Sequence, residues 1–193
     1  MAYNIRDISQ VSPQKKTYFF DSNVWLIILK PPMRLRQRDE KYLNFFEKFR
    51  NSPYHPKIAM LSLVLSEVIN RYIREVSYNM FLKKRGISKP TADTFKNVYR
   101  SSLEYQKDYN SLCEDIKSYQ NYFVLQSDGL QEEVKQRDIL REPPLKLDFN
   151  DLYYYQLAKS RQYTIVTDDG DFLVEDVEII TANGNLIKNA STI

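Results

Sequence analysis

The sequence predicts an α/β fold in which a central parallel β-sheet is flanked by helices. Short apolar runs of strand length alternate along the chain with segments of helical periodicity, which is typical of βαβ units. Several of these runs end in an acid or a helix-capping residue, as expected where a strand passes into a helix. We expect one domain spanning residues 1–193, with a helical insertion at about 75–140.

The first part of the chain contains two predicted strands, each followed by a helix. The first strand is "TYFFD" at 17–21, and Ser22 and Asn23 after it are residue types that begin helices. An amphipathic helix is predicted at 38–51, where aromatic residues recur at helical spacing. A second short apolar run at 55–62 is the second strand.

A long helical region follows the second strand. Its first helix is expected to stop at Gly86, after three basic residues that favour a helix C-terminus. A second helix is expected from about Pro90 to residue 119. The remaining predicted elements are a strand at 122–126, a short helix at 130–140, a helix capped by Asn150, and strands at 163–166 and 177–180.

The composition excludes several kinds of catalytic site. The chain has one cysteine, Cys113, and one histidine, His55, so a structural zinc site is nearly excluded. A Ser-His-Asp catalytic triad would have to use His55. Lys and Arg number 28 against 25 acids, a net charge of +3 that is a weak indication of a polyanionic partner. If the protein is a hydrolase, we therefore expect its catalytic groups to be carboxylates that bind a hard metal ion.

The same features predict a cytoplasmic protein with no membrane association. A single cysteine cannot form an internal disulfide, which favours a reducing compartment. The first ten residues lack the basic region and apolar run of a signal peptide. The longest apolar run, at 24–29, is far too short to cross a bilayer.

Four acids stand where the predicted fold would bring them to one edge of the sheet. Asp21 ends the first strand, Glu67 lies early in the helix after the second, Asp151 begins a late helix, and Asp169 follows a late strand. Ligands of open α/β sheets bind beyond the carboxyl ends of the strands. Carboxylates gathered there repel unless Mg²⁺ or Mn²⁺ compensates them, and such ions can activate water against a phosphodiester.

The order of these motifs resembles the PIN-domain nuclease family. The matching segments are "FFDSNVW", "LSEVINRYIR", "DFNDLYYYQLAKS" and "TIVTDDGDF", which cover both ends of the chain. The resemblance implies a PIN-like parallel sheet between helices, with metal-dependent cleavage of RNA as its activity. It also implies the following site: an acidic quartet of Asp21, Glu67, Asp151 and Asp169, with Asp171 as a fifth metal ligand and Asn23 and Thr167 as neighbours.

The sequence departs from the family pattern in two places. The region at 75–140, between the second and third acidic motifs, is longer than in compact PIN toxins and could replace a dimer or partner surface. Asp168 precedes Asp169, so either could face the metal. The resemblance implies single-stranded or structured RNA as substrate, and an antitoxin-like protein or a second copy of the chain as partners.

Each acid also has a simpler interpretation. Asp21 could cap the following helix, and Asp151 could belong to the start of its own helix. Glu67 could form a surface ion pair with Arg71 four residues later. The segment "TDDGDF" could be a turn, whereas an EF-hand is excluded because its later ligands and glycine are missing.

Basic residues near these motifs are candidates for contact with the RNA backbone. Arg71 and Arg74 lie on the helix that carries Glu67 and could hold phosphates instead of pairing with acids. The basic segment 33–41 is either a solvated helix entrance or a second phosphate contact.

Two further functions compete with the nuclease. A phosphatase of the haloacid dehalogenase type also uses a strand-ending Asp, but its second acid two residues later is replaced here by Asn23. A catalytically weak or inactive PIN-like protein that binds RNA or a partner is the other alternative. Retention of all four acids argues against it.

Overall fold

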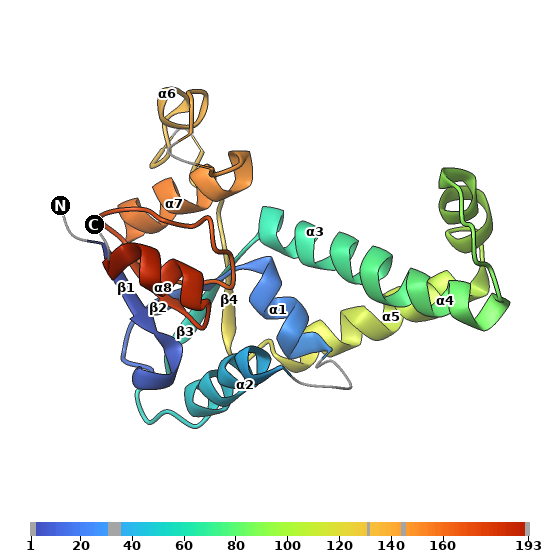
Figure 1. The fold of residues 1–193 in the computed structure, drawn as a ribbon, viewed down its shortest axis with the longest axis horizontal. Helices are drawn as coiled ribbons and strands as arrows, with labels where there is room; N and C mark the ends of the chain where they lie inside the picture. Colours follow the sequence, from blue (N-terminus) through green and yellow to red (C-terminus); the bar gives the residue numbers. More distant parts are fainter. Residues whose placement is uncertain (1–2, 31–35, 131, 144–145, 192–193) are drawn as a thin grey trace.

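Six parallel strands form one sheet within the described residues, and this confirms the predicted α/β class. The computed structural model describes residues 3–30, 36–130, 132–143 and 146–191. The strand order is β1-β6-β5-β2-β3-β4, and every neighbouring pair is parallel (Figure 1). The strands are β1 (Asn4–Asp7), β2 (Thr17–Phe20), β3 (Lys57–Leu61), β4 (Phe123–Gln126), β5 (Thr164–Val166) and β6 (Glu178–Thr181).

Helices connect the strands and cover the sheet. They are α1 (Ser22–Leu29), α2 (Gln37–Arg50), α3 (Ser62–Arg71), α4 (Tyr78–Arg85), α5 (Leu103–Ser118), α6 (Gln136–Ile139), α7 (Phe149–Arg161) and α8 (Gly184–Ser191), with π-helical segments η2 (Tyr72–Ser77) and η3 (Thr94–Tyr99) and a 3₁₀ turn η1 (Ile8–Gln10). Across the described ranges, none of these helices combines the length and apolar character needed to cross a bilayer.

The central strand β2 is buried on both faces, as parallel sheets covered by helices require. Side chains of a strand alternate between its two faces. Tyr18 and Phe20 pack against Phe49 of α2 on one face, with ring centroids 5.4 and 5.7 Å apart. Phe19 packs against Tyr154 of α7 on the other face, at 4.8 Å. This packing fixes α2 and α7 relative to the carboxyl end of β2.

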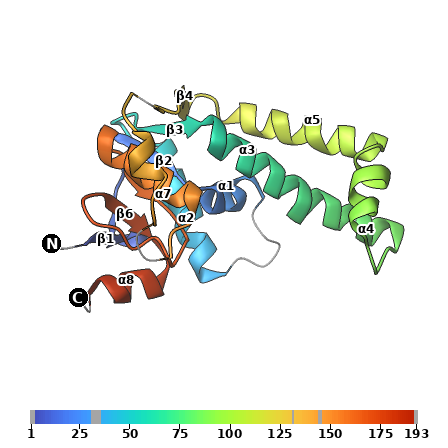
Figure 2. The same cartoon turned by 90° about the horizontal axis from the view of Figure 1, so that it is seen from above.

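The segments from α3 to α5 form a helical arm, defined here as residues 62–118, that projects from the sheet. Figures 1 and 2 both show α3 and α5 running side by side, with α4 at the far end. The arm has a small apolar core of its own, made of Ile73, Phe81, Leu82, Tyr99, Leu112 and Ile116. Gly86 ends α4 in a left-handed conformation, with φ of 65°, as predicted.

Several predicted elements differ from the structure. The region at 75–140 is helical only as far as Ser118, because β4 and a loop with the single turn α6 follow. Of the helix expected at 130–140, only the single turn α6 forms, and before it Leu130 forms an isolated bridge with Val134. The residue that caps α7 is Asp148 rather than Asn150, since the Asp148 side chain accepts a hydrogen bond from the Asp151 amide. Strand β1 and helix α8 were not predicted.

Candidate functional site

The strand order places a topological switch point between β2 and β5. The chain leaves β2 towards β3 and β4 on one side, and returns through α7 to β5 and β6 on the other. Ligand sites of open parallel sheets form where the order reverses in this way. Asp21 follows β2 directly and its amide donates to the carbonyl of Val166, 3.0 Å away. This hydrogen bond brings Asp21 beside Thr167.

Asp21 is a buried carboxylate, only 5% exposed. Its Oδ2 accepts hydrogen bonds from Thr167 Oγ1 at 2.9 Å and from Asn23 Nδ2 at 2.8 Å. Burial raises the pKa of Asp21, and the charge of Glu67 raises it further, while the two hydrogen bonds oppose this. Although Asp21 occupies the N-cap position of α1, its side chain makes no capping hydrogen bond. The simple capping interpretation of Asp21 is therefore wrong.

Glu67 joins the site through hydroxyl groups. Its Oε1 accepts from Ser22 Oγ at 2.7 Å, and its Oε2 accepts from the Tyr154 hydroxyl at 3.2 Å. The expected ion pair with Arg71 is long, with Arg71 Nη1 3.9 Å from Oε1. Glu67 is thus held between α1 and α7 rather than mainly by its neighbour on α3.

Arg71 and Arg74 have different surroundings. Arg71 Nη1 donates to Ser22 Oγ at 2.9 Å and to Asn23 Oδ1 at 2.8 Å, and its Nε donates to Glu75. Arg71 therefore borders the carboxylate site. The guanidinium of Arg74 lies 4.5 Å from the centre of the Phe95 ring, at the exposed surface of the helical arm. The structure thus brings Arg71, but not Arg74, to the site.

Asp151 has two roles at once. It forms a capping box with Asp148 at the start of α7, as the interpretation of Asp151 as part of its helix start predicted. Burial raises the pKa of Asp151 to about 7, and the charges of Asp148, Asp21 and Asp169 contribute in that order. The charges of Asp21 and Asp169 therefore reach the Asp151 carboxyl, so the fold gathers acids from α7 and from the ends of β2 and β5.

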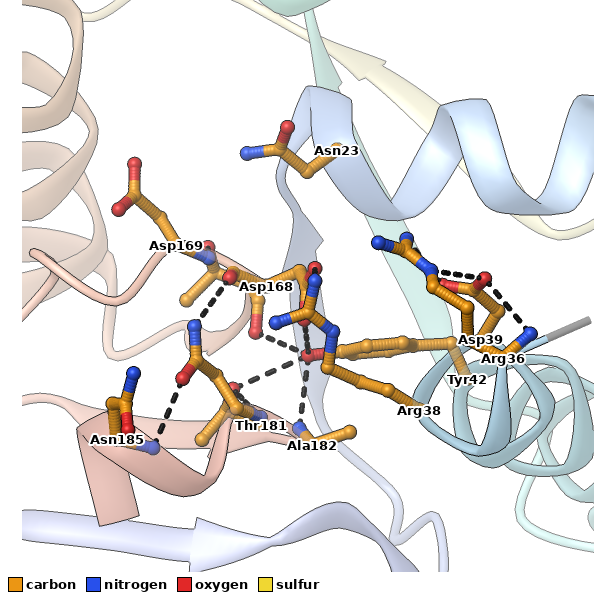
Figure 3. A network of polar contacts seen from close by, with 12 residues as sticks. Asn23, Arg36, Arg38, Asp39, Tyr42, Asp168, Asp169, Thr181, Ala182 and Asn185 are labelled. Carbon is orange, nitrogen blue, oxygen red and sulfur yellow. Dashed lines mark hydrogen bonds and ion pairs between the residues drawn. The ribbon is translucent and has the colours of Figure 1, made fainter. Parts of the chain in front are cut away.

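The two acids after β5 point in different directions. Asp168 forms an ion pair with Arg38 at 3.0 Å and lies 3.1 Å from the Tyr42 hydroxyl. Figure 3 shows the Asp169 carboxylate directed away from this network. Asp169 Oδ1 accepts from the Asp171 amide at 2.8 Å. Asp168 is therefore held by α2, whereas the charge of Asp169 acts on Asp151.

Asp171 and the described part of the basic segment, residues 36–41, form their ion pairs with residues outside the quartet. Asp171 is exposed and pairs with Lys146 at 3.4 Å. Residues 31–35 are outside the described residues, so the segment is seen from residue 36 onward. Its two described arginines pair with acids, Arg36 with Asp39 at 2.7 Å and Arg38 with Asp168.

Sequence reasoning missed Tyr42, which holds the acidic turn in place. Its hydroxyl lies 2.8 Å from the carbonyl of Thr167, accepts from the Ala182 amide at 2.8 Å, and is 3.2 Å from Thr181 Oγ1 (Figure 3). Burial raises the pKa of Tyr42, and the charge of Asp168 raises it further. The available signal was its position four residues before Phe46, on the apolar stripe of α2.

Removing the Tyr42 hydroxyl is expected to destabilise the fold. Tyr42→Phe leaves the Ala182 amide without its buried acceptor, which costs about 1–3 kcal/mol. Urea unfolding of the variant measures this loss. Tyr54→Phe is the control, because Tyr54 is 53% exposed and should change stability by less than about 0.5 kcal/mol. Equal stability of Tyr42→Phe and wild type would contradict the role of the hydroxyl.

The raised pKa of Asp151 predicts a particular pH dependence of stability. Its ordinary value of 3.8 applies to the unfolded chain, so between about pH 4 and 7 the native state binds more protons. The stability contributed by the protonated group is complete below that window and is lost as pH rises through it. In chelator, Asp151→Asn should therefore gain on wild type from pH 4 to pH 8 by about 1–2 kcal/mol, less than the roughly 4 kcal/mol expected for a fully buried group, because Asp151 is partly exposed to solvent. Urea unfolding of both proteins over this pH range measures the gain. An equal change of unfolding free energy with pH in both proteins would contradict the prediction.

The donors at the site fit a hard divalent cation in kind. Asp21, Glu67, Asp151 and Asp169 offer only carboxylate oxygens, the ligands that Mg²⁺ and Mn²⁺ prefer. Within the described part of the chain, Asp21, Asp151 and Asp169 form no ion pair that would compensate their charge. Among the same residues, no three acidic, histidine or cysteine side chains are arranged as a ready-made metal cage. Side-chain movement would accompany binding of an ion.

Comparison with known proteins leaves the family open. No protein-family model matches the chain, and no curated protein matches it. One solved structure, described as the crystal structure of PAE2754 from Pyrobaculum aerophilum, is 14% identical with a TM-score of 0.44. The similarity covers 96% of this chain and 97% of that one. The PIN resemblance thus stays a prediction, and a functional assignment depends on the site itself.

Proposed function

We propose that this protein is a metal-dependent endoribonuclease with a PIN-like site that binds Mg²⁺ or Mn²⁺. The observation that carries the proposal is the uncompensated charge of Asp21. This carboxylate is almost fully buried at the switch point, has no basic partner among the described residues, and lies within electrostatic reach of Glu67 and Asp151. An uncompensated buried charge is costly, so a bound cation is the simplest resolution.

The proposed roles follow from the contacts of each side chain. Asp21 would be the central ligand, oriented by Thr167 and Asn23. Asp151 and Asp169 would complete the site from α7 and from the turn after β5. Glu67, held by Ser22 and Tyr154, would add the fourth carboxylate. When bound, the divalent ion would supply activation of water and stabilisation of the negative charge that develops on the phosphate.

RNA is favoured over a small phosphate ester. In the phosphatase alternative the residue two positions after the first Asp is an acid, but here Asn23 donates to Asp21 and accepts from Arg71. Arg71 at the border of the site suits a substrate with further phosphates beyond the one that is cleaved. The inactive binding protein is the remaining alternative, and it is favoured only if no hydrolysis occurs.

The test compares two substrates under matched conditions. Labelled single-stranded RNA and p-nitrophenyl phosphate are incubated with the protein, with Mn²⁺ or with EDTA. Cleavage of RNA that requires Mn²⁺ supports the proposal. Hydrolysis of the small ester alone favours the phosphatase, cleavage in EDTA excludes the metal mechanism, and binding without hydrolysis favours the inactive alternative.

Arg71 is expected to contribute to RNA binding more than Arg74 does. Loss of one phosphate contact to single-stranded RNA should lower the slope of log K against log salt by about 0.7. Fluorescence anisotropy with labelled RNA over a salt series measures this for Arg71→Ala. Arg74→Ala is the matched control on the same helical run, because its guanidinium covers Phe95. Identical slopes for both variants would leave Arg71 as a structural residue only.

A further inference from the structure

A pocket of about 510 Å³ is lined by residues of α3 and α7, the two helices that carry Glu67 and Asp151. Its walls come from the first turns of α3 and α7 and from the loop after β4. Ser66 of this pocket immediately precedes Glu67, and Phe149 and Tyr153 lie two residues on either side of Asp151. The pocket and the carboxylate site therefore use different faces of the same two helices, α3 and α7.

The pocket is apolar and has no positive charge. Phe149 and Leu130 line it although they are 53% and 51% exposed. Among the described residues, none that line it is Lys or Arg. A phosphate would find no counter-charge there, whereas a flat, neutral ring could stack on Phe149 and cover Leu130.

One corner of the pocket is polar and incompletely satisfied. Asp128 Oδ2 accepts from Ser62 Oγ at 2.7 Å, and the Tyr153 hydroxyl donates to the Asp128 carbonyl. Asp128 Oδ1 is shielded from solvent and accepts no hydrogen bond within the described residues. A shielded acceptor without a donor is costly, and a small rotation of the carboxylate would present it to a ligand.

We propose that this pocket binds a nucleobase of the RNA, on the same two helices that carry Glu67 and Asp151. The base stacks on Phe149 and donates its exocyclic amino group to the carboxylate of Asp128. Adenine, cytosine and guanine have such an amino group and uracil does not, so the pocket selects these bases over uracil. This inference rests on the proposed function for its substrate class.

The test measures binding in EDTA, so that it does not depend on cleavage. The probes are fluorescein-labelled oligo(A), oligo(C) and oligo(U) of about eight nucleotides. Wild type should bind oligo(A) and oligo(C) at least about fivefold more tightly than oligo(U). Phe149→Ala should weaken binding of oligo(A) by about fivefold or more. Tyr54→Ala is the control, since this aromatic residue has the same exposed fraction of 53% and lies outside the pocket.

A second variant tests the base preference itself. Asp128→Asn keeps an acceptor for Ser62 but presents an amide NH₂, which suits a uracil carbonyl, so the preference should vanish or reverse. Unchanged binding in Phe149→Ala would overturn the proposal and leave the apolar wall for a protein partner. An unchanged preference in Asp128→Asn would overturn the base assignment. Absence of RNA cleavage by a protein that keeps these base preferences would refute only the proposed function.

Discussion

Replacing Asp21 with Asn is expected to lower Mn²⁺-dependent RNA cleavage by at least about 100-fold. Asn has nearly the same shape, and its side-chain oxygen can still accept from Thr167 and Asn23, which hold Asp21 in the native site. The substitution removes the charge and little else. Initial rates on labelled single-stranded RNA, with the variant and wild type at the same Mn²⁺ concentration, give the size of the loss.

The matched control is an acid that lies outside the site. Asp176 is in the loop between β5 and β6, where it pairs with Lys159 at 2.7 Å and both side chains are nearly half exposed. Its φ of 62° is readily adopted by Asn. Asp176→Asn should therefore change the cleavage rate by less than about twofold. If Asp21→Asn keeps the wild-type rate while its fold is intact, Asp21 has no part in the chemistry.

The sheet could be predicted because its central strands carry a strong signal. The residues of β2, β3 and β5 are apolar on consecutive positions, as strands buried on both faces are, and acids or capping residues follow them. Strand β1 was missed because "NIRD" is polar and only partly buried. It pairs on one side only, with β6, and its place in the sheet depends on that partner.

The loop after β4 was misread because distant residues determine its shape. The sequence at 130–140 has helical composition, but Arg161 of α7 donates to the Ser127 carbonyl and pairs with Glu133. Gly129 adopts φ of 65° within this turn. Such tertiary contacts override local helix propensity.

The same limit applies to the acidic turn. Both Asp168 and Asp169 fit the motif, and local sequence has no means of choosing between them. Arg38 and Tyr42 of α2 lie more than a hundred residues earlier in the chain. Their ion pair and hydrogen bond hold Asp168 against α2. Sequence position could suggest that four acids meet at one edge, since strand ends of a parallel sheet coincide. Which of two adjacent acids faces the others depends on packing.

Manganese is expected to raise the melting temperature of the wild-type protein by about 5–10 °C. A ligand at 100 times its Kd stabilises the native state by about 2.7 kcal/mol, and each kcal/mol shifts the melting temperature of a chain of this size by about 2–4 °C. The ion would relieve the repulsion among Asp21, Glu67, Asp151 and Asp169. Differential scanning fluorimetry over a Mn²⁺ titration, started in EDTA, measures the shift.

The melting temperature of Asp21→Asn should respond differently to EDTA and to Mn²⁺. Burial and the charge of Glu67 raise the pKa of Asp21, so its ionised form destabilises the native state near neutral pH when no cation is bound. Asp21→Asn in EDTA should therefore melt at or above the wild-type temperature, and Mn²⁺ should add much less to it. Equal Mn²⁺ shifts in both proteins would remove Asp21 from the ion site. No shift in either protein would mean that the fold tolerates these carboxylates without a cation, and the argument for a metal-dependent nuclease would lose its physical basis.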